Sequence, residues 1–299
     1  MKKTIRSLLM AVFVMLIVTN GRADEGLTSY YRVASLGVSL NDAIVQVKDA
    51  LGTKGFEVIG EYHPGKNEKL YVVAYTRDDL QKTCLKVKDR GALASVLKIG
   101  FVVKDGKVDV SMLNPEYIFY AYLMDDADKY TTELKKVTID AKDALKAVGT
   151  DFTPFGGKVE TDDLKDYHYM MMMPYFNDPI ELEEFGSFEE GLSTIRKNLN
   201  AKKGNTVKVY ELVFKSQKIA VFGIGLLDAE EGEAHFLPII GEDHVAAMPY
   251  EIILQGNEAT MLHGKYRFAI HWPELTMSQF MKISNTPGDV EDMLEALTE

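Results

Sequence analysis

The stretch "SLNDAIVQVKDAL" at residues 39–51 has a counterpart in "SFEEGLSTIRKNL" at residues 187–199. Each stretch starts with a serine that can cap a helix, carries acidic residues in the first turn, and places apolar residues at helical spacing. The same amphipathic helix is therefore predicted twice in one chain.

The likeness between the two halves continues beyond these helices. "GFEVIGEY" at 55–62 matches "GNTVKVYE" at 204–211, and the strand-like "KLYVVAYT" at 69–76 matches "KIAVFGIG" at 218–225. The offset between the copies stays nearly constant, which indicates an internal repeat.

Each copy then continues into a hairpin. The two segments are "IGFVVKDGKVDVSML" at 99–113 and "YEIILQGNEATMLHG" at 250–264. Their turns, "KDGK" and "LQGN", have glycine where a tight hairpin turn needs a positive φ. We predict the α+β fold class, with two copies of a helix-plus-mostly-antiparallel-sheet unit joined by a helical connector.

The repeat sets the domain boundaries. The first α+β repeat takes residues 24–124, and the second takes 164–299 with a C-terminal helix that starts at Pro287. Residues 125–163 have apolar side chains at helical spacing followed by a stretch with proline and glycines, which predicts a helical connector and a linker. Within the second copy, "GKYRFAI" at 264–270 is a candidate strand.

Residues 1–23 have the pattern of a secretory signal peptide. Basic residues precede an unbroken apolar run from Leu8 to Val18, and Ala23 is a small residue at a position that a signal peptidase reads. The run is shorter than the roughly 20 apolar residues that span a bilayer. We expect cleavage before Asp24 and a periplasmic or secreted protein without a membrane span; an uncleaved anchor is the alternative.

The net charge and the cysteine content limit the partners that the protein can bind and the ways in which its fold can be stabilised. The net charge is −11 for the whole chain, and it becomes four units more negative once the signal peptide and its four basic residues are removed. Such a chain repels nucleic acid and anionic membrane surfaces. Cys84 is the single cysteine, so an internal disulfide is excluded and stability must come from the core.

Five stretches resemble a bacterial domain-of-unknown-function family, the one numbered three hundred and two, in its exported tandem-repeat form. The resemblance implies a small α+β sandwich whose members can self-associate, and it implies no established reaction. The stretches are "DAIVQVKDALGTKGFEVIGEYHPG", "VVKDGKVDVSMLNPEYIFYAY", "HYMMMMPYF", "MPYEIIL" and "GKYRFAIHWPELTMSQFMKI".

Standard catalytic signals are missing from the sequence. It contains no Gly-x-Ser-x-Gly elbow, no His-Glu-x-x-His, no Walker loop and no complete dinucleotide fingerprint. We therefore expect a non-catalytic periplasmic module that binds a small ligand or a metal. The space between the copies is the expected place for it, since pockets favour domain interfaces. A cell-envelope protein-interaction module and an enzyme with an unrecognised site are the alternatives. The sequence names no cofactor.

Two pairs of residues are candidates for ligand binding. Tyr117 and Tyr120 lie in the aromatic-rich "LNPEYIFYAYL", a predicted short helix, and their hydroxyls can line a pocket or the helix can pack on the sheet. His244 and Met248 are four residues apart and would share one face of a helix, although Pro249 and "YEIIL" favour the start of a strand there.

The run "DYHYMMMMPYFND" at 166–178 allows two interpretations. As a strand, it is apolar on both faces and predicts a buried central strand, the interpretation that we prefer. Alternatively, His168, Met170 and Met172 would share one face and offer three soft donors, which suit Cu(I). Similarly, "PELTMSQFMKI" at 273–283 predicts a stripe of core residues.

Overall fold

The computed structural model describes residues 26–299, so the predicted signal peptide at 1–23 lies outside the described residues. The chain folds into two consecutive α+β units. The first contains β1 (Leu27–Leu36), α1 (Leu40–Gly52), β2 (Glu57–Tyr62), the short 3-10 turn η1 (Pro64–Lys66), β3 (Leu70–Thr76), α2 (Asp78–Cys84), η2 (Gly91–Ser95), β4 (Leu97–Lys104), β5 (Lys107–Leu113) and α3 (Pro115–Leu123).

A helical connector and a second unit follow. The connector contains α4 (Asp126–Lys129), α5 (Thr131–Leu145), β6 (Thr153–Val159) and α6 (Thr161–Lys165). The second unit contains β7 (Ile180–Glu184), α7 (Phe188–Asn200), η3 (Lys203–Asn205), β8 (Thr206–Phe214), β9 (Ile219–Leu226), α8 (Glu233–Ile240), η4 (Glu242–Ala247), β10 (Tyr250–Gln255), β11 (Glu258–Met261), α9 (Gly264–His271), α10 (Met277–Phe280), η5 (Met281–Ile283) and α11 (Thr286–Glu295).

The two units have the same strand order. The first sheet runs β2-β3-β4-β5-β1, with β6 added beyond β1, and the second runs β8-β9-β10-β11-β7. Every pairing described is antiparallel. The prediction of two copies of one helix-plus-antiparallel-sheet unit, joined by a helical connector, is therefore confirmed.

Even the irregularities of the two sheets repeat. The pairing of β2 with β3 shifts register between Val58 and Gly60, and that of β8 with β9 shifts between Lys208 and Tyr210. Such β-bulges bend a strand and increase its twist. The shared bulge shows that the copies agree in register as well as in strand order.

Local sequence signals explain the repeated elements. Ser39 caps α1 by accepting a hydrogen bond from the Asp42 amide at 3.1 Å, and Ser187 caps α7 by accepting one from the Glu190 amide at 3.2 Å. In the two hairpin turns, Gly106 has a φ of 74° and Gly256 has a φ of 63°. This left-handed conformation costs glycine least, as the turn chemistry predicts.

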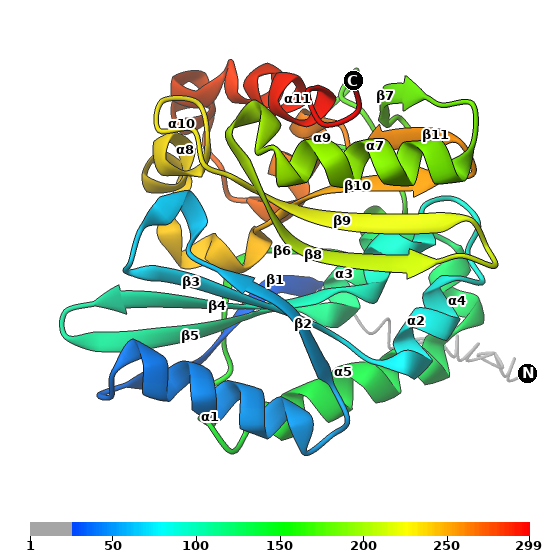
Figure 1. The fold of residues 1–299 in the computed structure, drawn as a ribbon. Helices are drawn as coiled ribbons and strands as arrows, with labels where there is room; N and C mark the ends of the chain where they lie inside the picture. The colour runs from blue at the N-terminus through cyan, green and yellow to red at the C-terminus, as the bar shows by residue number, and fades with distance from the viewer. Residues whose placement is uncertain (1–25) are drawn as a thin grey trace, which may run out of the picture.

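The elements form four layers (Figure 1). Figure 1 shows α1 and α5 along the outer side of the first sheet, α7 and α11 along the outer side of the second, and the two sheets between them. The segment η4 of the second unit packs on β3, β4 and β5 of the first. Gly100 of β4 permits this contact, because a Cβ there would lie 2.6 Å from a methyl carbon of Val245. The units therefore share one interior.

Several segments differ from what the sequence predicts. The first strand of each copy, β1 and β7, was not predicted. The segment 153–163, expected to be a linker, contains β6, which pairs with β1. "GKYRFAI" forms the helix α9 rather than a strand. The prediction of a buried central strand at 166–178 is also wrong, because this segment forms turns and bends between α6 and β7.

No helix in the described part of the chain is long and apolar enough to span a membrane.

Candidate functional site

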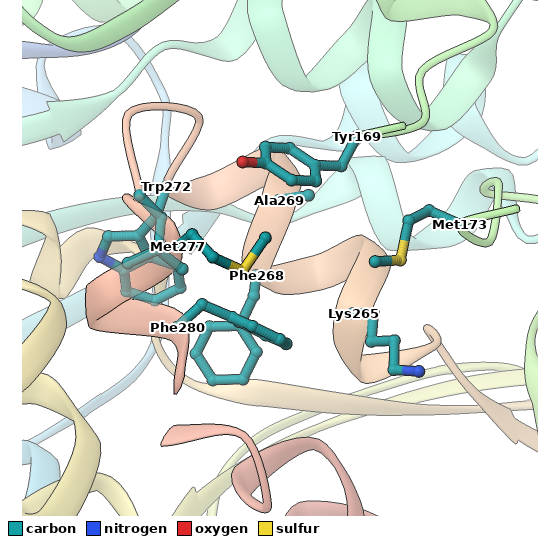
Figure 2. Close-up of a pocket in the computed structure, with 9 residues that line it drawn as sticks. Tyr169, Met173, Lys265, Phe268, Ala269, Trp272, Met277 and Phe280 are labelled. Atoms are coloured by element: carbon teal, nitrogen blue, oxygen red, sulfur yellow. The ribbon is translucent and has the colours of Figure 1, made fainter. Parts of the chain in front are cut away.

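An apolar groove lies on the second unit, between the methionine run and the helix α9 (Figure 2). Its free volume is about 40 Å³. Tyr169 and Met173 line one side, and the remaining walls come from α9 and the segment after it. Those walls are made by Lys265, Phe268, Ala269, Trp272, Leu275, Met277 and Phe280.

The helix α9 presents its outer face to this groove. His263 caps the helix by accepting a hydrogen bond from the Lys265 amide at 3.2 Å. Phe268 and Trp272 are four residues apart, and their ring centroids lie 5.5 Å from each other. Both rings are buried, so the groove has a rigid aromatic floor. Figure 2 shows the indole nitrogen of Trp272 pointing away from Met173 and Lys265.

The four methionines form an exposed turn at the rim of the groove. The Met173 amide donates to the Met170 carbonyl at 3.0 Å, and Met172 has a φ of 70°. The side chains of Met171 and Met172 are 86% and 96% exposed. A strand is disfavoured because the run has no β-branched residue and Pro174 follows it directly.

Exposed apolar side chains gather around this groove. Six of the nine large apolar side chains that are exposed in the described residues belong to the two segments that supply groove residues, 169–173 and 277–281, and we call these six the methionine patch. These six are Tyr169, Met170, Met171, Met172, Met277 and Met281. Exposed apolar side chains that gather beside a groove often mark a binding site. The predicted core stripe at 273–283 is thus mostly groove wall and patch, with Ile283 alone fully buried.

The predicted soft-metal residues all lie on or beside the exposed turn. The ring of His168 packs against Tyr175, with centroids 4.5 Å apart, and its Nδ1 lies 3.3 Å from the carbonyl oxygen of Asp166. Met170 and Met172 belong to the methionine patch. The metal site therefore stays a prediction. Among residues 26–299, no three side chains of His, Cys, Asp or Glu form a group that could hold a metal.

The two candidate tyrosines of α3 are separate from the groove. Tyr117 is fully buried, and its hydroxyl donates to the carbonyl of Ile270 at 2.8 Å. Tyr120 is half-buried, and the Lys165 ammonium lies 5.6 Å from its ring centroid. Tyr117 thus fastens the first unit to α9, and Tyr120 packs the connector.

The side chains of His244 and Met248 lie in different surroundings. Met248 is buried in the core of the second unit. The ring of His244 contacts those of Tyr30 and Trp272, with centroids 5.1 and 6.0 Å away. Burial lowers the pKa of His244 to about 4, so its imidazole is neutral at pH 7.

A second hollow of about 160 Å³ lies beside His244. It shares Trp272 and Leu275 with the groove, so the two hollows adjoin. Glu274 and Gln279 supply its polar lining. The Nε1 atom of Trp272 is buried and has no hydrogen-bond partner among residues 26–299. A buried indole N–H normally finds an acceptor.

A charged network that the sequence did not reveal lies between the units. Lys98 of β4 pairs with Glu251 of β10, and the Nε of Arg267 lies 3.5 Å from the other oxygen of Glu251. All three side chains are buried. Arg267 also donates to the carbonyls of Ala247 and Pro249, at 2.6 and 2.7 Å. The network therefore joins the two units through buried charges.

A second polar contact joins the units at Glu233. Its carboxylate accepts hydrogen bonds from the Tyr62 hydroxyl at 2.6 Å and from the Gly65 amide at 2.8 Å. Glu233 is fully buried, and burial raises its pKa to about 7 despite these hydrogen bonds. In sequence, Glu233 stood in an acidic loop with nothing to distinguish it from its neighbours.

Comparison with solved structures found a likeness over part of the chain. No family model matches the chain, and no curated protein matches it. One solved structure that is similar to part of the chain is an uncharacterized conserved protein of Bacillus stearothermophilus, described as DUF302. The likeness covers 40% of this chain and 98% of that one, with 12% identity and a TM-score of 0.34. It says nothing about a ligand or an activity.

Proposed function

We propose that the protein is an exported interaction module of the cell envelope, which binds an apolar segment of another protein at the methionine patch. The small volume of the groove favours a protein segment over a small molecule as the ligand. Its 40 Å³ is far below the roughly 300–1,000 Å³ of sites that enclose a small ligand, whereas it suits one inserted side chain. The exposed methionines around it would then contact the rest of the segment.

The composition of the patch supports this function. Methionine side chains are unbranched and polarizable, so they adapt to partners of different shape. The aromatic floor made by Phe268 and Trp272 provides the rigid part that anchors a buried side chain. Of the classes that the sequence left open, the interaction module is the one that these features favour.

Site-specific photocrosslinking tests this function. A photoreactive phenylalanine analogue at Met172 should give one saturable adduct in envelope preparations. The same analogue at Ile139, an exposed apolar position on α5, should not. Ala269→Phe should abolish the adduct, because the added ring would fill the groove that Ala269 lines. Equal adducts from both positions, or an adduct that survives Ala269→Phe, would contradict the proposal.

The hollow beside His244 supports a second function, the binding of a small polar molecule. The buried Nε1–H of Trp272 has no hydrogen-bond acceptor among the described residues, so a bound molecule could supply one. The neutral imidazole of His244 and the carboxylate of Glu274 line the same hollow. Native mass spectrometry of gently purified protein should then show an added mass. Trp272→Phe, which removes the N–H and keeps an aromatic ring, should lose it.

Export is part of the proposal and rests on residues 1–23. N-terminal sequencing of the protein from the native envelope should find a chain that starts near Asp24. A chain that starts at Met1 in the membrane fraction would instead support a retained anchor.

A further inference from the structure

Among residues 26–299, two sets of methionines differ strongly in their access to solvent. Met171 and Met172 are the most exposed, and Met170, Met277 and Met281 are exposed as well. In contrast, Met112, Met248 and Met261 are at most 1% exposed. The exposed group is gathered at one groove, and the buried group is spread through the two cores.

Exposure decides which of these thioethers an oxidant can reach. In the reaction with a peroxide, the sulfur lone pair attacks one peroxide oxygen and the O–O bond breaks. The sulfur is oxidised to a sulfoxide, and hydrogen peroxide is reduced to water. Since each exposed sulfur needs only one peroxide molecule, this chemistry requires no further cofactor.

We propose that the methionine patch is an oxidation-sensitive modification site, and that its oxidation by peroxide-class oxidants stops binding at the groove. This inference rests on the proposed function. Met173 and Met277 line the groove itself, and Met171 and Met172 directly precede Met173 in the exposed turn. A sulfoxide is a polar hydrogen-bond acceptor, and an apolar partner would leave it without a donor.

The fold allows the switch to act without unfolding the protein. The turn at residues 170–173 lies outside both strands and helices, and its most exposed side chains make no part of either core. Oxidation there changes the chemistry of the surface while Met112, Met248 and Met261 keep the interior packed. Reduction of the sulfoxides would restore the thioethers, so the switch is reversible.

The first test is the order of oxidation. The purified mature protein is treated with hydrogen peroxide, quenched over time and mapped by peptide mass spectrometry. Met171 and Met172 should oxidise at least about tenfold faster than Met112, Met248 and Met261, which serve as controls within the same chain. Equal rates for the two groups would overturn the proposal.

The second test measures binding at the methionine patch with 1-anilinonaphthalene-8-sulfonate, an anionic dye whose aromatic rings bind exposed apolar surface. Oxidised wild-type protein should bind the dye several-fold more weakly, and a methionine sulfoxide reductase should restore binding. A variant with leucine at positions 170–173, 277 and 281 should bind the dye before and after peroxide. Unchanged dye binding by fully oxidised wild-type protein, or loss of binding by the leucine variant, would overturn the switch.

Ala269→Phe separates this proposal from the proposed function. If the reduced protein binds the dye and Ala269→Phe prevents it, the groove is the binding surface. Loss of dye binding on oxidation then supports the switch, even if photocrosslinking detects no protein partner. If Ala269→Phe leaves dye binding unchanged, the groove is not the surface that the dye reports and the switch proposal fails, while photocrosslinking at Met172 still decides the proposed function.

Discussion

Lys98 and Glu251 occupy the same place in the two copies. Lys98 is opposite Ala74 in the first sheet, and Glu251 is opposite Gly223 in the second. Since β3 and β9 are equivalent strands, the repeat brings equivalent residues together as a buried pair of opposite charge. Two identical residues at this position could not have formed an ion pair.

The two partners should differ in their effect on stability. Glu251 faces two cations, Lys98 and Arg267, so Glu251→Gln leaves two buried cations without a counter-charge. We expect a loss of about 3–5 kcal/mol in the free energy of unfolding. Lys98→Met should cost less, because Glu251 keeps Arg267 as its partner. Urea denaturation measures both.

Lys82→Ala provides the control for this pair of variants. It breaks the exposed pair between Lys82 and Asp78, and it should change stability by less than about 1 kcal/mol. If Glu251→Gln is as mild as Lys82→Ala, the buried network does not stabilise the contact between the units.

Glu233 should make stability depend on pH. Its ordinary pKa of 4.5 rises to about 7 in the folded protein, so the folded state holds a proton that the unfolded state releases. The free energy of unfolding should therefore fall as the pH rises from 4.5 to 7, by roughly 2–4 kcal/mol from this group. Glu233→Gln should remove this contribution, as urea denaturation across that pH range will show.

Over part of this pH range, the titration of His244 changes the free energy of unfolding in the opposite direction. Its pKa is lowered to about 4, so the folded state binds fewer protons than the unfolded state, and stability rises with pH from about 4 to 6.5. For this reason, the informative quantity is the difference between wild type and Glu233→Gln at each pH. A difference that does not vary with pH would show that Glu233 does not titrate there.

At the scale of elements, local chemistry determined what the sequence could predict. The serine caps and the glycine turns are signals that lie within a few residues, and the helices and hairpins that they mark are present. The strands β1 and β7 were missed because β1 pairs with the distant β5 and the short edge strand β7 is mostly glutamate. The glutamates of β7 disfavour a strand, whereas β1 does contain strand-favouring residues such as Tyr30, Tyr31 and Val33.

The candidate site shows the same limit. The sequence singled out the methionine run, which does border the groove, but it assigned the run to the core. Hydrophobicity alone does not distinguish a buried strand from an exposed patch, since both are apolar. Phe280 and Met277 line the groove together with residues of α9 only because the chain brings α10 to the same hollow, a tertiary arrangement that the sequence did not reveal.

The hairpin turns give a prediction at this scale. Gly106 has a positive φ, and a Cβ there would meet nothing within 4 Å, so Gly106→Ala isolates the cost of the backbone conformation. We expect a loss of about 1–2 kcal/mol in the free energy of unfolding. Gly37 is equally open but has no positive φ, so Gly37→Ala should be neutral or slightly stabilising. Similar losses for both variants in thermal denaturation would contradict this explanation.

At the scale of the whole molecule, the two copies depend on each other. The strands β2 and β8 cross at their shared bulges, where Gly60 meets its counterpart Tyr210. A Cβ on Gly60 would lie 2.2 Å from the carbonyl oxygen of Val209, so only glycine allows this approach. Together with the buried charges, this contact gives each unit an inner face that is complementary to the other unit and would be poorly solvated if it were exposed to water.

We therefore expect the two copies to unfold together. Separation would expose Lys98 on one unit and Glu251 and Arg267 on the other, together with the apolar side chains around them. Trp272, the only tryptophan, reports on the second unit by fluorescence, while far-ultraviolet circular dichroism reports on both. In urea, the two signals should follow one coincident transition. Two separate transitions would show that the units are independent domains, because an interface that stabilised neither unit would let each unfold at its own urea concentration.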